Sequence, residues 1–436
     1  MRKVLLVSPH FPPTNAADMH RLRLLVPFLA ENGWSAEVIA IAPESVAAPR
    51  DEWISDGLPA EVPVHRLRGL GLGWSRVPGL GTLGWRARPA VTRKGDELLA
   101  RGGFDLVFFS TTQWPVHLAG PRWLRRFGVP FVMDYQDPWV NDYYRNHPEV
   151  TPPGGRLRYA LSEVMARSLE PLVLRRCGGF TSVSEDYPRQ LESRYAWAAR
   201  IPRLVLPFPG SRRDFERARE SAPPQDVFDP RDGRHHWVYV GRGGRDMTTA
   251  VRCLFGALSD HGSRHPEFLR GVRLHFLGTS YAPAGRGVST IAPLAAEFGL
   301  SEVVAERPDR LPYAQTLRCL LDASALLAIC SDDPAYTASK IYPYLIARKP
   351  LLTVCHRDGG VAELLNRVGG GVCAAFDGVG DGAREVILRD WLESGAWERV
   401  GALDDEAFAP FLDDASARRL TSWWDDPLRR RSGGLS

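Results

Sequence analysis

Short apolar runs alternate along this chain with longer stretches whose apolar residues recur at helical spacing. The runs are rich in β-branched and aromatic residues, which favour strands. We expect strands at residues 3–8, 36–42, 62–67, 104–110, 130–135 and 179–184, and again at 237–240, 272–277, 303–306, 325–330, 351–355 and 372–376. Strands that alternate with helices are typical of βαβ units and parallel sheets. The pattern therefore predicts an α/β protein with two doubly wound parallel sheets.

The stretch 198–234 departs from this alternation, because Pro, Asp and Arg recur there with little periodicity. Such composition is typical of a link between domains. We therefore expect an N-terminal domain at 1–208, a second domain at 209–395, and a helical tail at 396–436. The tail carries Leu420, Trp423 and Trp424, which are expected to dock it back on the N-terminal domain.

Two segments of the first half are harder to interpret. Leu22, Leu25 and Leu29 predict a helix, and Pro27 inside it predicts a kink. The segment 69–85 is rich in Gly, Leu and Trp and follows neither period. It is either a loop whose tryptophans pack on the sheet or a flap that contacts an acceptor or a membrane surface.

Composition narrows the class of protein. The 436 residues are 44% hydrophobic and 24% charged, which is ordinary for globular domains, and the formal net charge of +4 is too small for a dedicated nucleic-acid binder. No nucleic-acid partner is expected. The six cysteines lack metal-ligand spacing and read as reduced thiols of a cytoplasmic protein. No apolar run is long enough to span a bilayer, so any membrane contact is expected to be peripheral.

Ligands of open parallel sheets bind beyond the carboxyl ends of the strands. In the first half, the loop after the first expected strand contains Asn15 and Asp18 and leads into a helix with Arg21 in its first turns. A helix start offers free N–H groups to a phosphate or a sugar hydroxyl. The alternative is that Asn15 or Asp18 only caps the helix.

The corresponding loop of the second half begins Gly241-Arg242-Gly243 and continues to Arg245. Glycines allow close backbone approach, and the arginines offer fork-shaped donors to a diphosphate. The loop is neither a Walker loop nor a complete GxGxxG motif.

A third segment links an apolar strand to a helix and contains Thr337, Ser339 and Lys340. Thr337 or Ser339 is suited to cap the helix. A lysine at a positive helix end is favourable only where an anion is bound, and the alternative is a solvated Lys340.

The order of these segments resembles the retaining GT-B glycosyltransferases of family four. The opening Val-Ser-Pro-His-Phe-Pro-Pro is similar to that family's first strand and loop. Phe-Val-Met-Asp-Tyr-Gln-Asp-Pro-Trp at 131–139 resembles its Asp-x-x-Asp-Pro-Trp segment, Thr-Ser-Val-Ser-Glu at 181–185 its last N-domain strand, and 339–350 its donor-binding helix.

This resemblance implies two Rossmann-like domains that face a central cleft, with a nucleotide-sugar donor on the C-terminal domain. The acceptor, a small molecule, a glycan or a lipid-linked glycan, would bind the N-terminal domain. Arg242 and Arg245 match the cations that hold the donor diphosphate, and His117 matches a histidine that contacts the donor sugar. Asp137 would bind the acceptor. The alternatives are a core role for His117 and an Asp-Pro turn for Asp137.

Two departures from the family pattern concern the donor. The first loop has Asn-Ala-Ala-Asp at 15–18 where relatives often place paired glycines, and a pair of glutamates is missing. The family's paired glutamates fall here on Ala335 and Pro343. Asp332, Asp333 or Tyr342 are candidate substitutes, and Thr337 is a further candidate contact to the nucleotide or sugar. The missing glutamates keep two alternatives open: a GT-B sugar-nucleotide epimerase, and a catalytically silent homologue that binds a nucleotide sugar.

The expected activity is hexosyl transfer with retention. The acceptor hydroxyl would attack on the face from which the diphosphate leaves, and a phosphate oxygen would take its proton. Such chemistry depends on positioning and on neutralising the leaving group. No Asp-x-Asp metal motif precedes a suitable turn. No metal ion or other cofactor is expected beyond the nucleotide-sugar co-substrate.

Overall fold

The computed structural model describes residues 1–76, 81–142, 145, 155–280, 282, 285–332, 341–377 and 382–428. The chain forms two compact units. Unit 1 comprises Met1–Phe208 and Asp413–Ser436, and unit 2 comprises Pro209–Leu412. The tail expected from residue 396 is therefore divided, because residues 396–412 belong to unit 2.

Unit 1 is built on a sheet of seven parallel strands in the order β3-β2-β1-β4-β5-β6-β7. The strands are β1 (Arg2–Val7), β2 (Trp34–Ile41), β3 (Val64–Leu67), β4 (Leu106–Ser110), β5 (Phe131–Tyr135), β6 (Gly179–Ser182) and β7 (Arg203–Val205). Leu6 of the central β1 pairs with Val38 of β2 and Phe108 of β4. All six strands expected in this half are present, and β7 was not expected.

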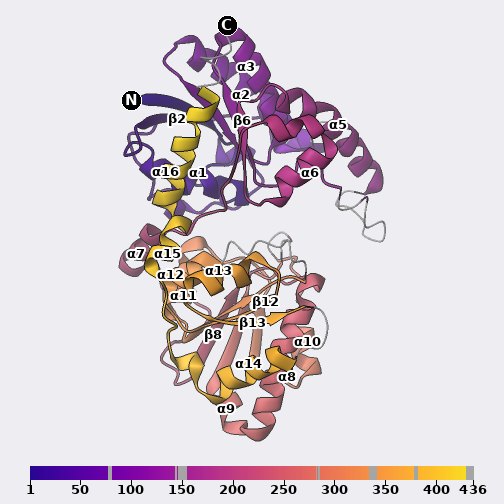
Figure 1. Cartoon of the computed structure of the whole chain (residues 1–436), viewed down its shortest axis with the longest axis vertical. Coiled ribbons are helices and arrows are strands. Elements are labelled where there is room, and N and C mark those ends of the chain that lie inside the picture. The colour runs from indigo at the N-terminus through magenta and orange to yellow at the C-terminus, as the bar shows by residue number, and fades with distance from the viewer. Residues whose placement is uncertain are drawn as a thin grey trace. The chain divides into compact units, whose positions relative to one another are not determined.

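Helices cover both faces of this sheet (Figure 1). They are α1 (His20–Leu25), α2 (Leu83–Ala100), α3 (Ala119–Phe127), α5 (Arg156–Leu174), α6 (Asp186–Arg194) and α16 (Asp413–Trp423). On one face α2 and α3 pack over Phe109 and Phe131. On the other, α1 and α16 pack over Leu6 and Phe108. At Pro27, α1 gives way to a 3-10 turn, Val26–Phe28, because proline lacks the N–H that would continue the helix.

Unit 2 contains six parallel strands in the order β10-β9-β8-β11-β12-β13. They are β8 (His235–Val240), β9 (Val272–Leu277), β10 (Val304–Arg307), β11 (Ala325–Ile329), β12 (Leu351–His356) and β13 (Val372–Phe376). Counted from its own first strand, this order equals that of the first six strands of unit 1. The prediction of two doubly wound parallel sheets is confirmed.

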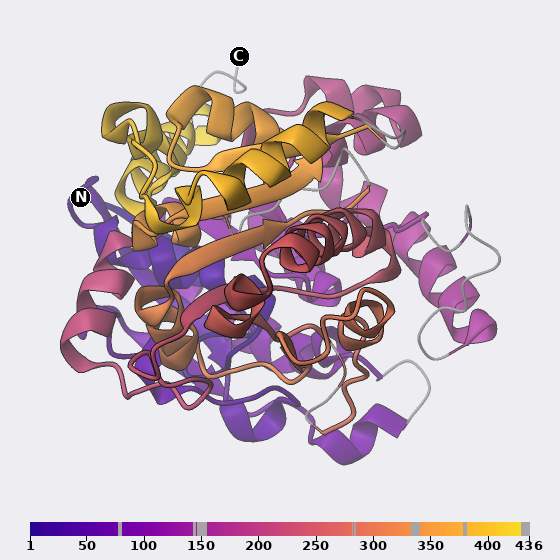
Figure 2. The ribbon, with the colours of Figure 1, turned by 90° about the horizontal axis from the view of Figure 1, so that it is seen from below.

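The helices of unit 2 also flank their sheet. They are α7 (Arg212–Ser221), α8 (Thr248–Arg264), α9 (Pro266–Gly271), α10 (Ala292–Glu297), α11 (Tyr313–Asp322), α12 (Ile341–Ala347), α13 (Gly360–Val368), α14 (Gly382–Glu393) and α15 (Asp405–Phe408). Helices α8 and α14 pack on one face, in front of the strands when seen from below (Figure 2). The core beneath them contains Phe255, Leu274 and Trp391. No described helix is both long and apolar enough to cross a bilayer.

The C-terminal helix α16 completes the core of unit 1. Trp424, directly after the helix, is fully buried. Its ring meets Trp34 at 4.8 Å and Phe108 at 5.5 Å between centroids, both edge to face. Residues more than three hundred positions apart in the sequence thus share one aromatic cluster, and the C-terminal segment is part of the fold of unit 1.

We predict that Trp424→Ala destabilises unit 1 by about 3–5 kcal/mol, because a buried tryptophan leaves a cavity that the core refills only in part. Hydrogen exchange read by mass spectrometry measures the effect, which should raise exchange in β1 and β4 while β8 and β11 stay protected. Trp74→Ala is the matched control, since Trp74 is 51% exposed. Equal exchange in the two variants would contradict the role given to Trp424.

Candidate functional site

Each sheet has one point at which the strand order reverses direction. It lies between β1 and β4 in unit 1 and between β8 and β11 in unit 2. The loops that follow neighbouring strands diverge there and leave a crevice at the carboxyl edge, where open α/β sheets bind their ligands. The loops after these four strands carry most of the residues singled out in the sequence.

In unit 1 the crevice is organised around Asp18, which is buried. Its carboxylate contacts Nδ1 of His10 at 2.6 Å and accepts hydrogen bonds from the Thr111 hydroxyl at 2.8 Å and the Thr112 N–H at 3.1 Å. Burial opposes the charge, but His10 and the two threonines outweigh it and lower the pKa of Asp18. Asp18 therefore joins the loops after β1 and β4 and does not cap the following helix.

Arg21 has a structural role that the sequence did not reveal. Its guanidinium is fully buried and donates to the Asp134 carboxylate, with 3.1 Å between Nε and Oδ2. It also donates to the carbonyls of Leu206 at 2.6 Å and Pro207 at 2.9 Å. The expectation that Arg21 belongs to a ligand-binding loop is not supported by these contacts, because its donors serve the fold of unit 1.

The loop after β4 carries His117 in a 3-10 helix, Trp114–Leu118. Its Nδ1 lies 3.1 Å from the carbonyl of Trp114, and its ring stacks on Phe109. Burial lowers the pKa of His117 to about 3, so the ring is neutral at physiological pH. Its Nε2 has no hydrogen-bond partner among the described residues. These contacts match the core alternative, with one ring nitrogen left unpaired.

Asp137 follows β5 and is exposed. Even so, the surrounding protein removes enough water from its carboxyl to raise the pKa to about 6, and the negative charge of Asp18 adds to the shift. A carboxyl that titrates near neutral pH at the carboxyl edge of the sheet can accept or release a proton there. Asn15 lies in the first loop, partly buried, and its N–H donates to the carbonyl of Pro49 at 2.8 Å.

In unit 2 the arginines of the loop after β8 have different surroundings. Arg242 donates to Asp246 through both terminal nitrogens, one at 2.8 Å. Asp246 also accepts from the Ser331 hydroxyl at 2.7 Å, which ties this loop to the one after β11. Arg242 and Ser331 lower the pKa of Asp246 against the effect of burial. Arg245 is exposed, and among the described residues no hydrogen bond or ion pair engages its side chain.

Asp332 lies in the loop after β11. Its carboxylate accepts from the Thr249 hydroxyl at 3.0 Å, and burial raises its pKa. Tyr342 lies elsewhere, since its ring stacks on Phe411 at 5.4 Å. The tyrosine that reaches this edge is Tyr344, whose hydroxyl contacts the N–H and the carbonyl of Val240 at the end of β8.

Thr337, Ser339 and Lys340, together with Asp333, fall outside the described residues, so their predicted contacts stay predictions.

The glycines of the loop after β8 are required by the packing of unit 2 itself. A Cβ at Gly241 would lie 2.2 Å from the Tyr239 hydroxyl, and one at Gly243 would lie 2.5 Å from the Thr290 hydroxyl. The Gly243 N–H also donates to the carbonyl of Thr279 at 2.7 Å. Close approach between neighbouring loops explains the glycines without a ligand.

Sequence reasoning missed His10 and Asp246, the partners of Asp18 and Arg242. His10 lines a pocket of about 410 Å³ in unit 1, together with Thr112, Trp114 and Trp139. The spacing of Arg242 and Asp246, four residues apart, was a signal that an ion pair would neutralise this arginine. The described residues contain no group of His, Cys, Asp and Glu side chains suited to hold a metal ion.

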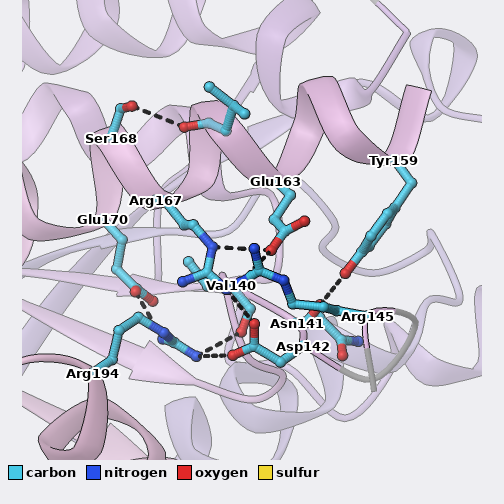
Figure 3. Close-up of polar contacts among 11 residues, drawn as sticks. Val140, Asn141, Asp142, Arg145, Tyr159, Glu163, Arg167, Ser168, Glu170 and Arg194 are labelled. Atoms are coloured by element: carbon cyan, nitrogen blue, oxygen red, sulfur yellow. Dashed lines mark hydrogen bonds and ion pairs between the residues drawn. The ribbon is translucent and has the colours of Figure 1, made fainter. Parts of the chain in front are cut away.

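A network of charged side chains joins α5, α6 and the loop after β5 (Figure 3). Arg194 at the end of α6 donates to Glu170 of α5 and to Asp142 in the loop after β5, each at 3.0 Å. Arg167 of α5 also binds Asp142, and the Tyr159 hydroxyl donates to a carbonyl of the same loop at 2.7 Å. Helix α5 is therefore held against the loop that carries Asp137 and Trp139.

Comparison with known proteins assigns this architecture. Residues 20–207 match the model of the glycosyl transferase 4-like domain. That match spans most of unit 1 and includes two of the four segments on which the sequence resemblance depended, 131–139 and 181–185. Together with the solved structures below, it confirms the resemblance to glycosyltransferases of the GT-B type. No curated protein sequence matches the chain significantly.

Solved structures extend the likeness of fold over both units. A glycosyltransferase from Rickettsia africae superposes with a TM-score of 0.58 at 12% identity, covering 98% of this chain and 99% of that one. Anabaena HepE, in complex with UDP and glucose, gives 0.53 at 13% identity and covers 99% of each chain. A UDP-GlcNAc 2-epimerase from Methanocaldococcus jannaschii gives 0.50 at 13%, covering 98% and 99%. Two parallel sheets arranged as in GT-B glycosyltransferases therefore describe this chain.

The raised pKa of Asp137 predicts a pH-dependent stability. A folded-state pKa of about 6, above the ordinary 3.8, means that the protonated carboxyl favours the folded state and that this contribution is lost as pH rises through 6. The Asp137→Asn variant has no titratable carboxyl at this position, so it does not lose this contribution. The melting temperature of the variant minus that of the wild type should therefore increase as the pH rises from about 4 to about 7.

Asp56→Asn serves as the control at an exposed position of unit 1, and its melting curve should run parallel to that of the wild type. Parallel curves for Asp137→Asn as well would show that the carboxyl is not desolvated in the folded protein.

Proposed function

We propose that this protein is a glycosyltransferase that moves a sugar from a nucleoside-diphosphate donor to an acceptor hydroxyl. The single observation that carries the proposal is the exposed Arg245 at the switch point of unit 2, which has no partner among the described residues, in a chain whose residues 20–207 match a glycosyl transferase 4-like domain. A free guanidinium at the crevice of a parallel sheet suits the charge of a leaving diphosphate.

The donor site proposed here has three parts. Arg245 binds the diphosphate, Arg242 with Asp246 fixes the shape of the loop, and Asp332 faces the nucleotide or sugar. The first turn of α8, directly after the loop, adds a positive helix end for the phosphates. Lys340 and Ser339 remain proposed contacts to the diphosphate. The complex of Anabaena HepE with UDP and glucose makes a UDP-sugar the first donor to test.

The acceptor is proposed to bind at the carboxyl edge of the sheet in unit 1. The carboxyl of Asp137 and the paired His10 and Asp18 are the polar groups available there for a hydroxyl. We propose that transfer retains the anomeric configuration and needs no metal ion, since the arginines supply the positive charge that the leaving group requires.

A second stereochemical course is favoured by one observation, the contact of His10 Nδ1 with the buried Asp18 carboxylate at 2.6 Å. A histidine oriented by a carboxylate can act as a general base through its other nitrogen. If His10 deprotonates the acceptor hydroxyl, attack comes from the face opposite the diphosphate, and the product is inverted.

Replacing the free arginine tests the donor site. Arg245→Gln should lower kcat by about 100- to 1,000-fold, the usual loss when one donor to a developing charge is removed. The measurement is transfer from a radiolabelled UDP-sugar to a panel of acceptors with EDTA present. Arg270→Gln, also an exposed arginine of unit 2, should keep full turnover.

Full turnover of Arg245→Gln would refute the diphosphate assignment, and turnover that requires added Mg²⁺ would refute the metal-free mechanism. Donor incubated without acceptor is the remaining control. Its conversion to a second sugar nucleotide would mean that the protein is an epimerase.

The configuration of the product distinguishes the two courses. Retention predicts that proton NMR finds the anomer of the donor in the product, and that His10→Gln leaves the pH profile unchanged because a phosphate oxygen takes the proton. Inversion with His10 as base predicts the opposite anomer and a loss of about 100- to 10,000-fold in His10→Gln. An inverted product would overturn the proposed retention.

A further inference from the structure

Arg86 carries a buried positive charge with no acidic partner among the described residues. It lies in the first turn of α2, and only 4% of it is exposed. Its Nη1 donates to the carbonyls of Leu70 at 2.9 Å and Ser45 at 3.3 Å, while its Nε has no partner. Burial alone lowers its pKa, and no carboxylate offsets the effect. A buried charge of this kind is costly unless an anion joins it.

Arg86 lines the 410 Å³ pocket of unit 1, and so does the N-terminal end of its own helix. Thr82 stands at the N-cap position, but its side chain caps no N–H, and the Gly84 N–H is bound by the Gln113 side chain at 3.0 Å. The start of an 18-residue helix adds partial positive charge to the same pocket. Two sources of positive potential thus converge on one pocket.

Apolar side chains form a further part of the lining of this pocket. Trp85, Trp114 and Trp139 contribute aromatic rings, and the last two stack in parallel with 5.3 Å between centroids. Met165 and Leu169 line the pocket from α5, the helix that the charged network of Figure 3 holds in place. Aromatic and aliphatic side chains beside polar groups favour a ligand that is itself partly apolar.

An exposed apolar stripe continues from this wall along α5. Leu157, Leu161, Val164 and Leu172 are 86%, 57%, 63% and 52% exposed. Their spacing of four, three and eight residues places them on one side of the helix, and Met165 of the pocket adjoins this stripe. Such a stripe on one helix is unusual for a surface that meets only water.

We propose that this pocket binds the acceptor as a phosphate ester of a long-chain alcohol. The phosphate lies between the Arg86 guanidinium and the start of α2, and the apolar chain lies against the tryptophans and leaves along the stripe on α5. The anionic group is inferred from the buried charge of Arg86, which has no acidic partner among the described residues. The apolar chain is inferred from the exposed stripe on α5. The role of this ligand as an acceptor rests on the proposed function. Its binding to the pocket does not, because the contacts of Arg86 and the lining of the pocket support the site independently.

Isothermal titration of the full chain tests the site directly, with farnesyl phosphate kept below its micelle concentration as the probe. Farnesol and inorganic phosphate are titrated separately to divide the contributions of chain and anion. Farnesyl phosphate should bind at least tenfold more tightly than either. Arg86→Gln should weaken the binding of farnesyl phosphate by about 10- to 100-fold, the usual contribution of a hydrogen bond to a charged group. The affinity for farnesol should not change.

Leu161 is exposed, so Leu161→Asp should leave the fold intact. This variant should bind farnesyl phosphate several-fold more weakly and inorganic phosphate as the wild type does. The matched controls are Arg93→Gln, an exposed arginine of α2, and Val386→Asp, an exposed valine on a helix of unit 2. Both should bind as the wild type does. If Arg86→Gln fails to fold, Arg86→Lys and Leu161→Asp still decide the question.

Farnesyl phosphate that binds no more tightly than farnesol would overturn the proposal, as would unchanged binding by both Arg86→Gln and Leu161→Asp. Association with phosphatidylglycerol vesicles that depends on Leu161, without binding of monomeric farnesyl phosphate, would mean that the stripe contacts a lipid surface, and would also overturn it. Because no donor is present, failure here leaves the transferase proposal standing. Conversely, loss of the transferase activity would leave this binding site standing.

Discussion

The buried pair of Arg21 and Asp134 is the constraint on which the rest of unit 1 depends. Asp134 accepts from Ser110 of β4 at 2.9 Å and from Thr181 of β6 at 2.7 Å, as well as from Arg21 of α1. Arg21 also donates to the carbonyl of Pro207, directly before the first segment of unit 1 ends at Phe208. Removing one partner of a buried pair costs about 3–5 kcal/mol, because the other charge stays buried. The carboxyl ends of β4, β5 and β6, where the proposed acceptor site lies, are fixed by this pair.

Charged side chains are distributed differently in the two units. Their positions determine where we propose that the donor and the acceptor bind. In unit 2 Arg242 is neutralised by Asp246, whereas the exposed Arg245 in the same loop has no acidic partner among the described residues. In unit 1 Asp18 is held ionised, whereas Asp137 titrates near neutral pH. Arg86 lines the pocket of unit 1 as a buried cation that no carboxylate of the described residues contacts. An anionic donor and an anionic acceptor would thus each meet positive charge in a separate unit.

The sequence could predict the fold because strand and helix periods depend on local pattern. It failed where the pattern is short or absent: β7 is a three-residue strand, and α7 lies in the Pro- and Arg-rich stretch interpreted as a linker. The site was predictable at the level of loops, since carboxyl ends of parallel strands share an edge. The side-chain partners could not be predicted, because they are distant in the sequence. Thr111, which donates to Asp18, is 93 positions away from it, and Asp134 is 113 positions away from Arg21. No local pattern encodes such pairs.

We propose that unit 2 binds the nucleoside diphosphate of a donor at the loop after β8. Hydrogen exchange read by mass spectrometry, with and without saturating UDP, tests this binding site most directly. We expect slower exchange at 241–249 in unit 2, while β1 and β4 of unit 1 exchange as before. If UDP instead protects only the loops of unit 1, or if saturating UDP, GDP, dTDP and ADP all leave the exchange of 241–249 unchanged, the donor does not bind at the loop after β8.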